Sequence, residues 1–415
     1  MVEICVRNRL QSPVEAFSPV PEHLVDARAS HSDRIRSGSV PLQAGDHRRV
    51  PELISKYGYE VESHSVTTED GYELTMFRIL PQQPSETPKL PVLMVHGLES
   101  SAVDFIIIGP NNSFAYLLAD NGYDVWLANA RGTRYSKKHS TLSVDSKEYW
   151  SFSWHEIGYY DLPAMIDYIL NTTSVSKLQY VGFSQGCTAY FVMATTRPEY
   201  NEKIALMTAL SPPVIVKRVR SPLVLLLSEV LKEFRKVKAS FKDFELLPYS
   251  NEYRTIAQAI CTDDARGNIC QKWISLIVGP DPDGYDQKVM TVYVGHTPAG
   301  ASINQVIHYA QIAQSKTFQQ FDYGRKENIL RYGSKKPPVY DLRLATAPVM
   351  IYYALNDWLV HPRDVQELAK VLPRVVEAVP VADKQFNHLD FALAKNVRTL
   401  LYDQAIQVME KFNEK

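Results

Sequence analysis

Short apolar runs alternate with amphipathic, helix-length segments along most of this chain. Residues 155–170 place Leu162, Met165, Ile166 and Ile169 at helical spacing, which predicts one helix. The apolar runs have the length of buried strands, and they occupy residues 92–95, 124–128, 178–181, 204–210, 349–355 and 375–381. Strands of this kind alternating with amphipathic helices predict an α/β fold with a mostly parallel sheet covered on both faces.

The same pattern divides the chain into four parts. Residues 1–45 are polar without helical or strand period, and we expect a disordered extension there. Residues 46–212 begin with a hairpin, 61–67 and 72–80 around Asp70-Gly71, and continue into the alternating segments. The alternation stops over residues 213–345, which we interpret as a mostly helical insertion into the sheet domain, and it resumes in residues 346–415.

Composition and charge argue against some classes of function, such as nucleic-acid binding. A formal net charge of −1, with acidic and basic residues interspersed, gives no electrostatic basis for binding nucleic acid. No apolar run reaches the roughly 18 residues that a membrane-spanning helix needs, and the N-terminus shows no secretory signal. Cys261 and Cys270 are nine residues apart, a spacing that fits either a short disulfide loop or two free thiols. Asn171-Thr172-Thr173 is a candidate N-glycosylation site.

The sequence Gly182-Phe183-Ser184-Gln185-Gly186 is the candidate nucleophile motif. It follows the predicted strand at 178–181 and precedes a predicted helix at 188–194. A serine on such a sharp strand-to-helix turn is exposed at the edge of the sheet, and flanking glycines avoid clashes with the strained backbone. We therefore predict that Ser184 is a catalytic nucleophile.

A serine hydroxyl near neutral pH needs a base within hydrogen-bond distance. His388 follows the last predicted strand, where the carboxyl ends of the strands meet, and is the predicted base. His308, inside the insertion, and His361, beside a proline at a helix start, are the alternatives.

A carboxylate should orient this base and stabilise its imidazolium form. Asp357 lies directly after the apolar run 349–355 and is the predicted partner. Asp364 is expected inside the next helix, and Asp390 is too close in sequence to His388 to face it.

The oxyanion that forms during acyl transfer needs backbone N–H donors. We expect one from Gln185 at the start of the helix after Ser184, and one from Leu98 in the loop His96-Gly97-Leu98 after the strand 92–95. This chemistry requires no cofactor and no metal ion, and we expect neither.

Further motifs surround these groups in the order of the chain. They are NGYDVWL at 121–127 with Arg131-Gly132, YDLPA at 160–164, GHTPAG at 295–300, NDW at 356–358 and NHLD at 387–390. Together with the Ser184 motif they resemble the acid lipase family, which includes gastric and lysosomal acid lipases and many insect lipases. The resemblance extends from about Tyr59 to Phe412, and GHTPAG is most similar to the insect members.

The resemblance implies an α/β-hydrolase fold, for which the chain order Ser184, Asp357, His388 is expected. It also implies a cap over the active site, a disulfide between Cys261 and Cys270, and hydrolysis of triacylglycerols or sterol esters at a lipid–water interface. Secretion or lysosomal location follows from the same resemblance, although no signal peptide is visible. The alternatives are a carboxylesterase for small soluble esters, a serine protease, and a non-catalytic lipid-binding homologue.

Overall fold

A computed structural model describes residues 48–83, 88–222, 224–226, 244–262 and 264–413. The predicted N-terminal extension lies outside these residues, as do residues 227–243 of the predicted insertion. Within the described residues, one sheet contains nine strands. They are β1 (Val61–Thr67), β2 (Tyr72–Ile79), β3 (Val92–Val95), β4 (Val125–Ala128), β5 (Lys138–His139), β6 (Leu178–Phe183), β7 (Ile204–Leu210), β10 (Val349–Tyr353) and β11 (Val375–Pro380).

The strand order is β1-β2-β4-β3-β6-β7-β10-β11, with β5 paired to β2. The strands from β4 to β11 are parallel, whereas β1 pairs with β2 and β2 with β4 in antiparallel register. This arrangement confirms the predicted mostly parallel sheet and the hairpin at its start.

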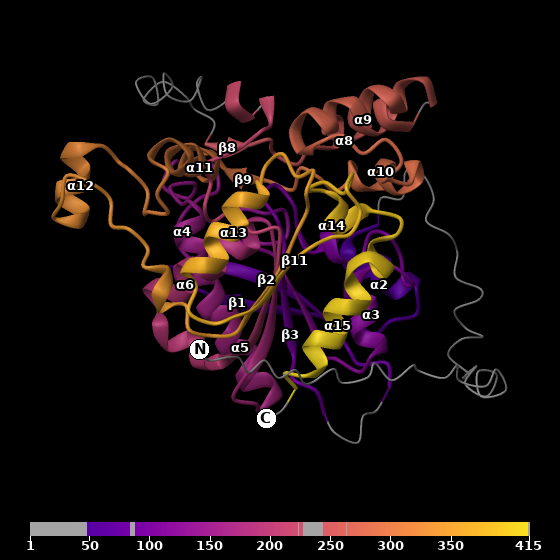
Figure 1. Cartoon of the computed structure of the whole chain (residues 1–415), viewed down its shortest axis with the longest axis horizontal. Coiled ribbons are helices and arrows are strands. Elements are labelled where there is room, and N and C mark those ends of the chain that lie inside the picture. The colour runs from indigo at the N-terminus through magenta and orange to yellow at the C-terminus, as the bar shows by residue number, and fades with distance from the viewer. Residues whose placement is uncertain (1–47, 84–87, 223, 227–243, 263, 414–415) are drawn as a thin grey trace, which may run out of the picture. The chain divides into compact units, whose positions relative to one another are not determined.

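Helices cover both faces of the sheet because neighbouring strand residues point to opposite sides. In β3, Val92 and Met94 belong to one apolar cluster, and Leu93 and Val95 belong to the other. The first cluster includes side chains of α2 (Val50–Lys56), α3 (Phe114–Asp120) and α15 (Asp403–Glu410), and the second those of α5 (Leu162–Thr173), α6 (Gln185–Thr196) and α13 (Pro362–Val371). Figure 1 shows these two groups of helices on either side of the strands.

Between β7 and β10 the chain is mostly helical. This insertion contains α8 (Asn251–Thr262), α9 (Asp264–Val278), α10 (Gln287–Tyr293), α11 (Ile303–Ser315) and α12 (Arg325–Tyr332), and β8 (Glu245–Leu246) pairs there with β9 (Ala301–Ser302). Figure 1 shows α8, α9 and α10 together beyond one end of the sheet. Short helical turns complete the fold: η2 (Ala102–Phe105), α4 (Trp154–Glu156), η3 (Ile157–Asp161), η4 (Pro198–Lys203), η6 (Leu342–Leu344), α14 (Asp390–Leu393) and η7 (Arg398–Tyr402).

The predicted helix at 155–170 is present and contains a π-helical turn. α4 leads into this turn, η3, and the helical backbone continues without a break into α5 at Leu162, where Pro163 has no N–H to donate to the preceding turn. Asp161, at the end of η3, accepts hydrogen bonds from the backbone N–H (3.0 Å) and Nε (2.7 Å) of the buried Arg131. This buried ion pair holds the π-helical turn to the loop after β4, a contact that periodicity does not reveal. The closing helix predicted from Leu389 is divided into α14, η7 and α15.

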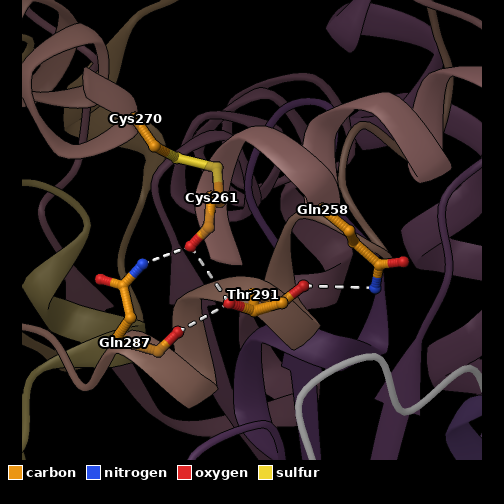
Figure 2. The surroundings of a disulfide bond; sticks show 5 residues. All are labelled: Gln258, Cys261, Cys270, Gln287 and Thr291. Carbon is orange, nitrogen blue, oxygen red and sulfur yellow. Dashed lines mark hydrogen bonds between the residues drawn. A yellow bond between two sulfur atoms is a disulfide. The ribbon is translucent and has the colours of Figure 1, made fainter. Parts of the chain in front are cut away.

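A disulfide joins Cys261 at the end of α8 to Cys270 in α9, with their Cα atoms 5.3 Å apart (Figure 2). The carbonyl of Cys261 accepts hydrogen bonds from the side chains of Gln287 and Thr291 on α10. Both cysteines are buried in the same apolar cluster as Met290 and Val292. The disulfide therefore stabilises a three-helix unit at one end of the sheet.

Replacing both Cys261 and Cys270 by serine is expected to loosen this unit. The closed loop of about ten residues should contribute roughly 2–3 kcal/mol through the entropy of the unfolded chain. Amide hydrogen exchange in α8 and α9 should accelerate accordingly, while exchange in β3, β6 and β7 should change little. Addition of reductant to the wild-type protein should reproduce the effect, and unchanged exchange after reduction would contradict this role.

Candidate active site

The turn between β6 and α6 holds Ser184 in a left-handed backbone conformation, with φ of 50° and ψ of −116°. A Cβ atom on Gly186 would lie 2.1 Å from the carbonyl oxygen of Val95, and one on Gly182 would lie 2.9 Å from the nitrogen of Cys187. Side chains at these two positions would collide with backbone, which explains both glycines of the motif. The turn places the Ser184 side chain at the carboxyl end of the parallel strands, as the sequence predicts.

Ser184, His388 and Asp357 lie within hydrogen-bond distance of one another in series. Ser184 Oγ is 2.8 Å from His388 Nε2, and His388 Nδ1 is 2.7 Å from Asp357 Oδ2. The other carboxylate oxygen of Asp357 accepts hydrogen bonds from the backbone N–H groups of Leu359 and Val360, both at 2.8 Å. Asp357 is fully buried and His388 is 5% exposed, so water competes little with these bonds.

Ser211 is a fourth member of this arrangement that the sequence analysis did not identify. It follows β7, has a φ of 50° and is fully buried. Its hydroxyl donates to Asp357 Oδ2 at 2.5 Å and lies 3.1 Å from His388 Nδ1. In the sequence, Ser211 is marked only by its position at the carboxyl end of a central strand. Many residues that make no such contact share this kind of position.

The alternative residues lie elsewhere. His308 stacks on Trp154 with ring centroids 3.5 Å apart, and burial lowers its pKa well below the usual value. His361 caps α13 by accepting from the N–H of Arg363. Asp364 accepts from the backbone N–H groups of Lys217 and Arg218 and pairs with the Arg218 guanidinium. None of the three has a hydrogen bond to Ser184 or His388 among the described residues.

The loop after β3 lies directly against the nucleophile turn, since a Cβ atom on Gly97 would be 3.3 Å from Ser184 Cβ. His96 is buried and neutral, with a pKa lowered to about 4 by burial, and its Nε2 accepts the N–H of Ala130 at 3.1 Å. Asp104 holds both ends of the loop, because its carboxylate accepts from the Gly97 N–H (3.1 Å) and from the Ser100 hydroxyl. Leu98 is thus fixed between two anchored positions.

Burial also raises the pKa of Asp104 to about 6, against the lowering effect of its hydrogen-bond donors. Tyr293 of α10 donates to the same carboxylate at 3.3 Å. Asp104 therefore connects the loop beside the nucleophile to a helix of the insertion.

A cavity of about 520 Å³ opens onto Ser184 and His388. Its walls are mainly aliphatic and come from both the sheet domain and the insertion, and they include Leu98, Val216, Ile274, Ile277, Val294 and Leu359. Ile274 and Ile277 lie on α9, in the insertion. A cavity of this size and lining fits a long hydrocarbon group better than a small polar one.

Asn171, the candidate glycosylation position, is exposed in the last turn of α5. The described residues contain no cluster of three or more His, Cys, Asp or Glu side chains arranged to hold a metal ion. In that same part of the chain, none of the helices combines the length and apolarity needed to cross a membrane.

Known proteins resemble this chain over most of its length. The family profile described as the alpha/beta hydrolase fold matches residues 91–392, and that of a partial alpha/beta-hydrolase lipase region matches residues 50–109. Lipase 1 of Drosophila melanogaster is 43% identical over 366 residues, which are 88% of this chain and 80% of that protein. Gastric triacylglycerol lipase of Mus musculus is 36% identical over 376 residues, 89% of this chain and 93% of that protein.

A solved structure of a putative lipase from Sulfolobus solfataricus superposes with a TM-score of 0.56 at 12% identity, and the match covers 90% of this chain and 97% of that one. At that identity the likeness concerns the fold alone. The sequence relatives carry the similarity beyond the fold, and the residues matched by the family profile, 91–392, include Ser184, Asp357 and His388.

Proposed function

The chain belongs to the α/β-hydrolase family and, within it, to the lipases related to gastric triacylglycerol lipase, and on this premise we propose that it hydrolyses the carboxylic ester bonds of neutral lipids. The observation that supports this most strongly is the hydrogen-bonded series of Ser184, His388 and Asp357 at the wall of a large apolar cavity.

In the proposed mechanism, Ser184 Oγ attacks the ester carbonyl while His388 Nε2 takes its proton. Asp357 holds the Nδ1–H of His388 and stabilises the imidazolium that results. The backbone N–H groups of Leu98 and Gln185 donate to the tetrahedral oxyanion. His388 then protonates the leaving alcohol, and the acyl group remains on Ser184. Water, deprotonated by His388, attacks this acyl-enzyme; the bond between the acyl carbon and Ser184 Oγ then breaks, His388 returns the proton to Ser184 Oγ, and the fatty acid leaves.

We propose that the insertion, residues 213–345, acts as a cap that presents the site to a lipid–water interface. Exposed apolar side chains occupy one stripe of α8, at Tyr253, Ile256 and Ile260, and part of α9, at Trp273 and Leu276. Ile256 is 60% and Trp273 61% exposed, while Ile274 and Ile277 of α9 line the cavity. An apolar outer surface that continues into an apolar cavity is suited to contact with an oil phase and to transfer of an acyl chain from it.

The substrate class can be tested by measuring hydrolysis against acyl chain length, with soluble and with emulsified esters. A lipase should act faster on emulsified long-chain triacylglycerols or sterol esters than on soluble short esters. Faster hydrolysis of short soluble esters, with no increase at an interface, would instead identify a carboxylesterase.

The double variant Ile256→Ser, Trp273→Ser is expected to lose about tenfold in activity on emulsified triacylglycerol, because two large apolar groups no longer enter the oil phase. Its activity on a soluble butyrate ester should remain within about twofold, since neither side chain lines the cavity. Leu330→Ser is the matched control, because Leu330 is 80% exposed but lies on α12. An equal loss on both substrates, or an equal loss in the control, would argue against a specific interfacial surface.

The disulfide also supports a location for the protein. A cysteine pair of this kind persists in oxidising compartments, and we propose that the functional protein is secreted or lysosomal. Glycosylation of Asn171, which is exposed, would accompany passage through the secretory pathway and would appear as a mass shift reversed by a glycosidase.

A further inference from the structure

Two buried carboxyl groups meet where the insertion contacts the loop that carries His388. Asp281 lies in the turn after α9 and is 5% exposed, and Asp390 begins α14 and is fully buried. No Lys, Arg or His side chain is within ion-pair distance of either one in the described part of the chain. Neither charge is therefore neutralised by a cation.

The two carboxyl groups lie close together, and no donor among the described residues hydrogen-bonds to Oδ1 of Asp390. Their approach is visible at Gly284, where a Cβ atom would lie 2.7 Å from Asp281 Oδ2 and 2.9 Å from Asp390 Oδ1. Two ionised carboxylates can only accept hydrogen bonds, so a bond between them requires that one be protonated.

We propose that Asp281 and Asp390 share one proton and act as positioning residues that fasten the insertion to the loop of His388. Asp390 Oδ2 accepts from the backbone N–H of Asn387, the residue directly before His388. Asn387 in turn donates to the carbonyl of Gly279 at 2.9 Å and accepts from the hydroxyl of Tyr285 at 2.8 Å. The shared proton thus completes a network that joins residues 279–285 to the loop. Its role in catalysis rests on the proposed function of His388.

The network should depend on pH. Burial raises the pKa of both carboxyl groups, that of Asp390 to about 8, and their mutual repulsion raises it further for Asp390. The titratable groups that face the pair are Asp383, whose charge raises the pKa of Asp281, and Tyr285, whose hydroxyl bonds within the network. The pKa of Asp390 in the folded protein exceeds its value of about 4 in the unfolded chain. Its contribution to the free energy of unfolding is therefore fully present below about pH 4, and it is lost as the pH rises through about 8. The pair therefore favours the folded junction at acidic pH.

Thermal unfolding of the full-length wild type, Asp390→Asn and Asp281→Asn at pH 5 and pH 9 tests the shared proton. The wild type should lose roughly 5 °C more in melting temperature across this range than either variant, because only the wild type gains a second buried carboxylate. Asp283→Asn is the control, since Asp283 is exposed on the same turn and its variant should follow the wild type. If the difference in melting temperature between Asp390→Asn and the wild type is the same at pH 5 and at pH 9, the proposal is overturned.

Labelling of Ser184 by a fluorophosphonate tests the positioning role. We compare the rate constants for labelling of Ser184 in the Asp390→Asn variant and in the wild type. Their ratio, variant to wild type, should rise about threefold from pH 6 to pH 9, because only in the wild type does the contact between residues 279–285 and the His388 loop loosen. A constant ratio would mean that the pair stabilises the fold without placing His388. A protein that is labelled under no condition would reject the proposed function, and the unfolding curves would still decide whether the proton is shared.

Discussion

Replacement of Ser184 by alanine is expected to abolish ester hydrolysis, with a loss in kcat on the order of 10⁶-fold. The variant lacks the oxygen that forms the acyl-enzyme, and His388 then has no hydroxyl to deprotonate at Nε2. Labelling by a fluorophosphonate should disappear together with hydrolysis. The melting temperature should remain close to that of the wild type, because the strained turn is set by Gly182 and Gly186 and alanine fits wherever serine does.

Ser174→Ala is the matched control for this experiment. Ser174 also has a positive φ, 55°, but lies at the exposed end of α5. Activity of this control should equal that of the wild type. Labelling of the Ser184→Ala protein at another serine, or residual hydrolysis comparable to the wild type, would exclude Ser184 as the nucleophile.

Alternation of apolar runs and amphipathic helices was sufficient to predict the sheet and the two helical layers. The predicted strands at 61–67, 92–95 and 204–210 coincide with β1, β3 and β7, because each is a short apolar or alternating run bounded by turn residues. The resemblance to acid lipases, stated from motifs alone, is confirmed by the sequence relatives. Strand-end positions also placed Ser184, Asp357 and His388 at one edge of the sheet, where the structure brings them within hydrogen-bond distance.

Other features depend on contacts that no local pattern encodes. The ion pair at the end of the π-helical turn η3 joins Arg131 and Asp161 across 30 residues of sequence, and the Ser211 hydroxyl reaches Asp357 across 146 residues. The carboxyl pair of Asp281 and Asp390 forms only when the insertion folds back onto the last loop of the sheet domain. From the sequence, Asp390 is part of the NHLD motif and is excluded as the partner of His388, but nothing in the sequence indicates its contact with Asp281.

Replacement of Asp357 by asparagine is expected to lower kcat/KM on the order of 10⁴-fold while leaving the protein folded. The amide oxygen can keep the hydrogen bonds from the N–H groups of Leu359 and Val360, which turns the NH₂ group toward His388 Nδ1. Nδ1 must then accept rather than donate, so the proton of the neutral imidazole moves to Nε2. In this tautomer His388 cannot accept the proton of Ser184, and the imidazolium formed in the transition state lacks its counter-charge.

Asp364→Asn provides the comparison, because it removes the charge of a similarly buried carboxylate that also accepts two backbone N–H groups. Its partners are Lys217, Arg218 and α13, so the expected change in kcat/KM is no more than a few-fold and the main effect should be on stability. Measuring kcat/KM and the melting temperature of both variants separates the two roles. Of these two carboxylates, only Asp357 combines backbone N–H donors on one oxygen with His388 and Ser211 on the other, and a loss of similar size in the two variants would mean that this geometry does not orient the base.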